Sequence, residues 1–172
     1  MGRQHAILEQ WDRLERPAAT EAILPCNGSI AWAIGMVDTR PFETPEALFG
    51  ASDKVWQGLA PSDWQEALDS HPRIGEHNAK AATVQSLKWS VDEQSAAAMD
   101  VATEDALAAA NKEYEQKFGR IFIVCAAGKS AAEILGILKA RLANDATTEL
   151  IEAVEQQRQI TQLRLRKWLG IG

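Results

Sequence analysis

Apolar residues recur three and four positions apart along most of the chain, which is the spacing of amphipathic α-helices. Residues that cap helix N-termini stand before several of these stretches, and some are followed at the third position by the Glu or Gln of a capping box. We therefore predict helices that begin after Thr44, Ser62, Ser90, Thr103 and Ser130. Gly119 predicts the end of the alanine-rich helix that follows Thr103.

A further long helix is predicted after Asn144 and Asp145, which interrupt the helical pattern. Its inward positions are predicted to be Leu150, Ala153, Val154, Ile160, Leu163 and Trp168. The basic residues of its final turn suit the negative end of the helix dipole.

Only residues 121–125 look like a strand, because they are β-branched, aromatic and few. No second segment offers itself as a pairing partner, so helix ends, water or a ligand must satisfy the buried N–H groups of this segment. The sequence predicts an all-α fold, with residues 1–172 as a single-domain bundle of roughly eight to ten helices and one short, buried extended segment.

Composition and charge exclude several classes of protein. The 172 residues are 46% hydrophobic, enough for one full core, and carry a net charge of −6. An acidic chain without a basic run lacks the electrostatic features of a nucleic-acid or membrane-surface binder. The longest apolar stretches, 30–37 and 121–127, fall short of the ~20 residues of a membrane span. Two cysteines among apolar neighbours indicate a reducing compartment, and we expect a cytoplasmic protein.

Two tempting sites fail on spacing. Gly128-Lys129-Ser130 looks like the end of a phosphate-binding loop, but Ile123 stands where that loop needs its first glycine. His71 and His77 are six positions apart, with Pro72 and Gly75 between them, whereas a zinc-binding helix places two histidines four apart. The sequence therefore predicts neither a nucleotide site nor a metal site.

The segment Ser70-His71-Pro72 leaves a helix and enters an irregular loop. A loop histidine suits proton chemistry, because imidazole titrates near neutral pH, but it also suits the C-terminal end of a helix dipole. Ser90, with Glu93 and Gln94, is equally explained by helix capping. The ordinary interpretation of Arg164 is an exposed residue in the last turn of a helix, and that of Cys125 is an unreactive core residue.

Taken together, these motifs resemble one family, the 2-oxo-4-hydroxy-4-carboxy-5-ureidoimidazoline (OHCU) decarboxylases of purine breakdown. The resemblance covers most of the chain. It includes Arg40-Pro41-Phe42, Ser70-His71-Pro72-Arg73-Ile74-Gly75, Trp89-Ser90-Val91-Asp92-Glu93-Gln94, Asn111 with Tyr114, Lys117-Phe118-Gly119, Phe122-Ile123-Val124-Cys125-Ala126, Arg141-Leu142-x-Asn144, and Ile160-Thr161-Gln162-Leu163-Arg164-Leu165.

The resemblance implies an all-helical homodimer that works without a metal or an organic cofactor. Its substrate would be a small anionic ureidoimidazoline, converted to (S)-allantoin with loss of CO2. No nucleic acid and no membrane partner is implied.

The resemblance also implies roles for single residues. His71 would donate the proton, Glu93 would orient or polarise the histidine or the substrate, and Arg164 would bind the substrate's negative charge. Substrate-binding positions would be Pro72, Ser90, Gln94, Phe122, Ile123, Val124, Cys125 and Ala126, with the last five offering unpaired backbone amides as an oxyanion-type donor set. The alternative is a non-catalytic helical interaction module, in which capping, packing and a dipole-facing histidine explain each feature singly.

Overall fold

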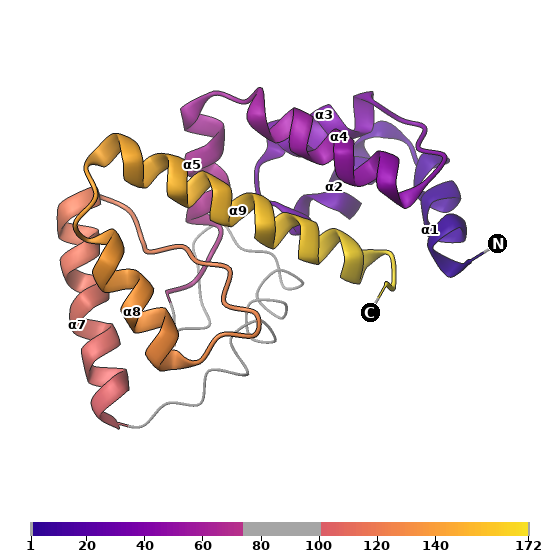
Figure 1. The fold of residues 1–172 in the computed structure, drawn as a ribbon. Coiled ribbons are helices and arrows are strands. Elements are labelled where there is room, and N and C mark those ends of the chain that lie inside the picture. Colours follow the sequence, from indigo (N-terminus) through magenta and orange to yellow (C-terminus); the bar gives the residue numbers. More distant parts are fainter. Residues whose placement is uncertain (1, 74–100, 172) are drawn as a thin grey trace. The chain divides into compact units, whose positions relative to one another are not determined.

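The computed structural model describes residues 2–73 and 101–171, and all regular secondary structure in this part is helical (Figure 1). It comprises eight α-helices and one short 3-10 helix in the ranges described, so the predicted all-α class is confirmed. The chain divides into two compact units, one made of Met1–Ala67 with Arg158–Gly172, the other of Leu68–Gln157. None of the described helices has both the length and the apolar character needed to cross a bilayer.

The first unit is built mainly from the N-terminal helices. These are α1 (Arg3–Asp12), α2 (Arg16–Ile23), η1 (Leu24–Cys26), α3 (Ile30–Asp38), α4 (Pro45–Gln57) and most of α5 (Pro61–Asp69), joined by the end of α9 (Ala146–Trp168). Trp11 lies at the centre of one aromatic cluster, with its ring centroid 6.2 Å from that of Phe42 and 5.6 Å from that of Trp168. Arg40 lies over the Trp11 ring and donates to the Trp11 carbonyl at 2.8 Å, so the Arg40-Pro41-Phe42 motif ties the end of α1 to this core.

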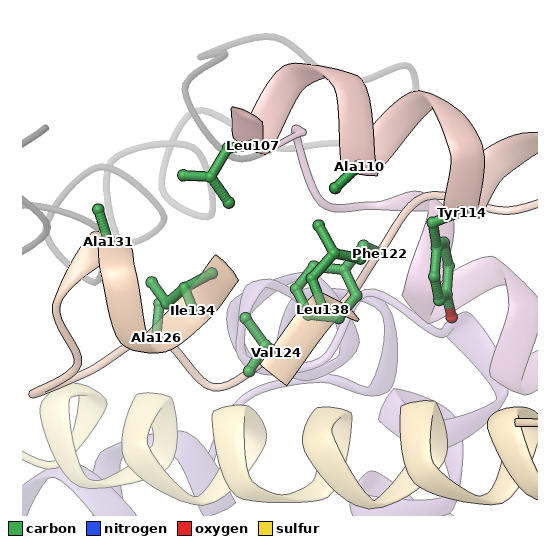
Figure 2. Close-up of a cluster of buried hydrophobic side chains, with 9 residues drawn as sticks. All are labelled: Leu107, Ala110, Tyr114, Phe122, Val124, Ala126, Ala131, Ile134 and Leu138. Carbon is green, nitrogen blue, oxygen red and sulfur yellow. The ribbon is translucent and has the colours of Figure 1, made fainter. Parts of the chain in front are cut away.

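The second unit packs α7 (Val101–Phe118) against α8 (Ala131–Arg141) (Figure 1). Side chains from both helices and from the segment between them converge in one hydrophobic cluster (Figure 2). Its buried members are Leu107, Ala110, Tyr114, Phe122, Val124, Ala126, Ala131, Ile134 and Leu138.

The segment between these helices confirms the predicted buried, extended stretch. Residues 121–126 are neither helix nor strand, and residues 122–126 are all buried. Alternate residues of the segment belong to the cluster of Figure 2, which is the period of an extended chain. Gly119 and Gly128 flank the segment with φ of +70° and +75°, a region that favours glycine and lets the chain leave α7 and enter α8 sharply.

The predicted helix starts have different outcomes. Thr44 caps α4 and Ser130 closes a full capping box on α8, as predicted. Two predictions were wrong by a few residues. The helix α5 already begins at Pro61, whose fixed φ suits a first helical position, so Ser62 lies inside its first turn. Thr103 likewise lies inside α7, which is helical from Val101. Ser90 lies outside the described residues.

The buried face of α9 differs from the predicted one. Ala153 and Ile160 are buried as predicted, whereas Leu150, Val154, Leu163 and Trp168 are only half-buried. Leu165 is buried as well, and polar side chains take the remaining buried positions, namely Glu149, Gln157, Thr161 and Arg164. A periodicity count of apolar residues misses such positions, because it assumes that polar side chains face water.

Candidate active site

His71 lies just beyond the end of α5, in the second unit. Its backbone N–H donates to the Leu68 carbonyl at 3.4 Å, and its side chain is buried, with the residue only 8% exposed. Interaction with the end of α5 is not the only contact of His71, because its ring Nε2 lies 2.6 Å from Oε1 of Gln157 in α9. His71 is therefore a buried, hydrogen-bonded ring and not a surface charge on a helix dipole.

Of the two residues that follow His71, one is buried and the other forms an ion pair. Pro72 is buried beside His71. Arg73 is exposed, and its Nε lies 2.8 Å from Oε1 of Glu115 in α7. This ion pair links the residue after the His-Pro pair to α7, within the second unit.

The backbone of the buried segment is held by side chains. The Cys125 N–H donates to Oε1 of Gln156 at 2.8 Å, and Gln156 donates in turn to Glu152 at 3.0 Å. The Cys125 carbonyl accepts from Nζ of Lys129 at 2.7 Å. The expectation that the segment offers unpaired amides is therefore wrong for Cys125, because the carboxamide of a neighbouring helix supplies the missing acceptor.

Adjacent glutamines of α9 thus contact two of the predicted site elements. Gln157 contacts His71, and Gln156 contacts the amide of Cys125. Both were missed from the sequence. The signal that could have found Gln157 is its place on the stripe at 149, 153 and 157, where residues four apart share one helix face.

A buried ion pair contacts the backbone of the extended segment 121–126. Arg141 binds Glu149 through Nε at 2.9 Å and through Nη2, and its Nη1 donates to the Ile123 carbonyl at 2.5 Å. Tyr114 and Asn144 donate to the same carboxylate at 2.5 and 3.0 Å. Burial, reinforced by the hydrogen bond to Glu149, raises the pKa of the Tyr114 phenol far above its usual range. The phenol therefore stays a hydrogen-bond donor at any physiological pH.

Arg164 lies in the first unit and is almost fully buried, at 1% exposure. The interpretation as a residue of a solvated last turn is wrong for Arg164 and correct for Arg166 and Lys167, which are exposed. Its Nη1 donates to the Pro25 carbonyl at 3.2 Å, and its charge partly offsets the rise that burial causes in the pKa of Cys26. The Arg164 guanidinium is therefore a buried, hydrogen-bonded group.

Three predicted site residues, Ser90, Glu93 and Gln94, lie outside the described residues. Within the ranges 2–73 and 101–171, no cluster of three or more His, Cys, Asp or Glu side chains could hold a metal ion. The described groups support hydrogen bonding, charge pairing and proton transfer.

Comparison with known proteins points to one family. The sequence model of the family described as OHCU decarboxylase matches residues 12–166. The uric acid degradation bifunctional protein TTL of Arabidopsis thaliana is 37% identical over 144 residues, which are 83% of this chain and 44% of that protein. The uric acid degradation bifunctional protein of Bacillus sp. (strain TB-90) is 27% identical over 131 residues, 74% of this chain and 25% of that protein. This chain thus spans less than half the length of these curated relatives.

Solved structures give the same result. The crystal structure of an OHCU decarboxylase in the presence of (S)-allantoin has a TM-score of 0.74 and 33% identity, and the match covers 86% of this chain and 96% of that one. The structure of an (S)-allantoin synthase shares the fold, with a TM-score of 0.71 at 16% identity over 94% of this chain and 53% of that one. With nine-tenths of its sequence matched by the family model and its fold shared with a solved member, the chain belongs to the OHCU decarboxylase family.

Proposed function

We propose that this protein decarboxylates OHCU to (S)-allantoin, using no metal and no organic cofactor. The observation that carries the proposal is the buried His71 ring, held by Gln157 in a chain of this family. A related OHCU decarboxylase, 33% identical, has been crystallised in the presence of (S)-allantoin, which supports this product.

The substrate itself supplies the electron sink. Its carboxylate leaves from a carbon next to a ring C=N, so the electron pair of the breaking C–C bond delocalises into that π system as CO2 departs. The protein must hold the carboxylate out of the ring plane, stabilise the anionic intermediate and deliver one proton to one face of the ring carbon that bears the ureido group, while the hydroxyl-bearing carbon becomes the carbonyl. His71 is proposed as that donor, because imidazole has a pKa near the working pH.

The remaining predicted residues are proposed to bind the substrate. Arg164 would pair with the negative charge through its guanidinium fork. Pro72 and the backbone of residues 122–126 would contact the ring and the ureido group, with Cys125 able to offer its N–H only when Gln156 releases it. Glu93, Ser90 and Gln94 keep the roles that the family resemblance implies. We also propose that the protein is a cytoplasmic homodimer.

The test is circular dichroism of the allantoin formed from freshly generated substrate, with and without the protein. Spontaneous decay of the substrate gives racemic allantoin, so rapid appearance of the (S) enantiomer reports catalysis with chiral proton delivery. A slow, racemic signal from folded protein would overturn the proposal and would leave the helical interaction module as the function to test.

Replacing His71 is predicted to remove most turnover. We expect His71→Ala to lower kcat by about 10²–10⁴-fold, the usual contribution of one positioned acid or base. Thermal unfolding followed by circular dichroism checks that the variant is folded. The matched control is His5→Ala, because His5 lies in α1 of the first unit and has no proposed role. A folded His71→Ala variant with near wild-type turnover would exclude His71 as the donor.

A further inference from the structure

We infer that Gln157 is a positioning residue that holds His71 as the Nε2–H tautomer, so that Nδ1 is the ring nitrogen that exchanges a proton with the substrate. The first half of this inference stands on geometry alone. The second half rests on the function proposed above.

The hydrogen-bond chemistry of the pair fixes the tautomer. Oε1 of Gln157 has no hydrogen and can only accept, and it lies 2.6 Å from Nε2 of His71. At this separation a hydrogen must lie between the two atoms, so Nε2 carries it. In neutral imidazole the other nitrogen, Nδ1, is then the basic one, so Nδ1 first takes up a proton from water to give the imidazolium and then delivers that proton to the substrate.

Burial makes this preference strong. Gln157 is fully buried and His71 is 8% exposed, so water cannot readily replace the lost partner if the hydrogen bond breaks. A carboxamide has no proton to accept or release near neutral pH. The proton on Nε2 therefore stays on the ring, and Gln157 orients His71 without entering the proton transfer itself.

The position of Gln157 on α9 adds precision to this orientation. The next side chain back, Gln156, accepts from the Cys125 amide at 2.8 Å. Two consecutive residues of one helix thus hold the imidazole and the buried segment, which are 54 positions apart in the sequence. A side-chain contact built on a rigid helix positions its partner better than one built on a loop.

The test is nitrogen NMR of the histidine rings in the whole protein, combined with steady-state kinetics. Long-range 1H–15N spectra at about pH 8, above the usual histidine pKa, report which ring nitrogen carries the hydrogen. We expect wild-type His71 to show the Nε2–H form. Gln157→Leu should raise the Nδ1–H form and lower kcat by about 10–100-fold, with KM changed by less than about 3-fold.

Two further variants separate positioning from general damage to the fold. Gln157→Glu keeps an acceptor oxygen at the same reach and should retain the Nε2–H form and more of the turnover than Gln157→Leu. Gln162→Leu makes the same substitution five residues later in α9, where the side chain bonds Phe49 and Asp53 of the first unit, and should change neither tautomer nor kcat.

Several results would overturn the inference. One is an Nδ1–H form in wild-type protein, which needs no variant to fold. Another is a folded Gln157→Leu variant with unchanged tautomer and unchanged kcat. Wild-type protein that shows the Nε2–H form but makes no (S)-allantoin would overturn the proposed function and leave the assignment of the tautomer standing.

Discussion

Single polar side chains do for residues 121–126 what a neighbouring strand does in a β-sheet. Arg141 and Lys129 donate to the carbonyls of Ile123 and Cys125, and Gln156 accepts from the Cys125 amide. These side chains come from α8, from the residue before its cap Ser130, and from α9. Their hydrogen bonds allow the segment to be buried without a neighbouring strand. The backbone conformation of the segment is therefore held in part by these three side chains.

The Arg141–Glu149 pair is the most sensitive of these supports. Glu149→Gln is nearly isosteric but leaves the buried Arg141 guanidinium without its counter-charge, which is expected to cost about 3–5 kcal/mol in the free energy of unfolding. Tyr114→Phe removes one donor to the same carboxylate and should cost only about 1 kcal/mol. Urea unfolding of both variants measures the difference. Equal losses would show that the ion pair contributes no more than a neutral hydrogen bond.

At this scale the sequence predicted some residues of the candidate site and missed others. His71 was singled out by its place at a helix exit before a proline, and the family resemblance gave it the role of proton donor. Gln156, Gln157 and Glu149 were not, because a polar residue on a helix is ordinarily solvated and only the packed structure shows which ones are buried. Arg164 was named through the family resemblance, while its local context of charged neighbours predicted exposure.

At the scale of the element, local signals specify most helix boundaries. Caps at Thr44 and Ser130 and the glycine after α7 acted as predicted, because each satisfies backbone groups that the helix leaves unpaired. The starts of α5 and α7 were misplaced, since Pro61 and Val101 already adopt helical geometry before the expected cap. The period of the extended segment was also predictable, but the side chains that pair with its backbone were not.

Asp145 provides a pH-dependent support at the start of α9. Its Oδ1 accepts from the Thr148 N–H at 2.7 Å, and this bond holds the pKa of Asp145 below its ordinary value. Since the folded state binds the proton less readily than the unfolded state, the stabilisation is complete above the ordinary aspartate pKa and is lost as the pH falls through the folded value.

The corresponding prediction concerns Asp145→Ala. At neutral pH this variant should melt at a lower temperature than wild type, and the gap should close as the pH is lowered from about 7 towards 3. Differential scanning calorimetry across this range measures both effects. A gap that stays constant with pH would mean that the ionised carboxylate does not stabilise the helix.

At the scale of the whole molecule, α9 contributes to both compact units. Its first part belongs to the unit of Leu68–Gln157, and Arg158 onward belongs to the unit that begins the chain. The sequence predicted one domain of 172 residues, and that expectation stays a prediction. Length and composition limit the size of a hydrophobic core, but they do not reveal which chain segments belong to which of two compact units.

Removing residues 158–172 is predicted to unfold the first unit. Ile160, Leu165 and Leu169 are buried there, and full burial of each such side chain contributes about 1.5–3 kcal/mol. Their combined loss approaches the whole stability of a typical domain, about 5–15 kcal/mol. Far-UV circular dichroism should lose more helix than the deleted residues account for. A control that lacks only residues 170–172 keeps all three side chains and should retain its helix content and its melting transition.

The sharing of α9 has a consequence for synthesis of the chain on the ribosome. The first 67 residues emerge early, but the segment Arg158–Gly172 that completes their unit emerges only after residues 68–157 have been added. At about 5–20 residues per second, this interval lasts roughly 5–18 s. During that time Trp11 lacks its neighbour Trp168, so nascent chains expose apolar surface that a holdase chaperone can bind.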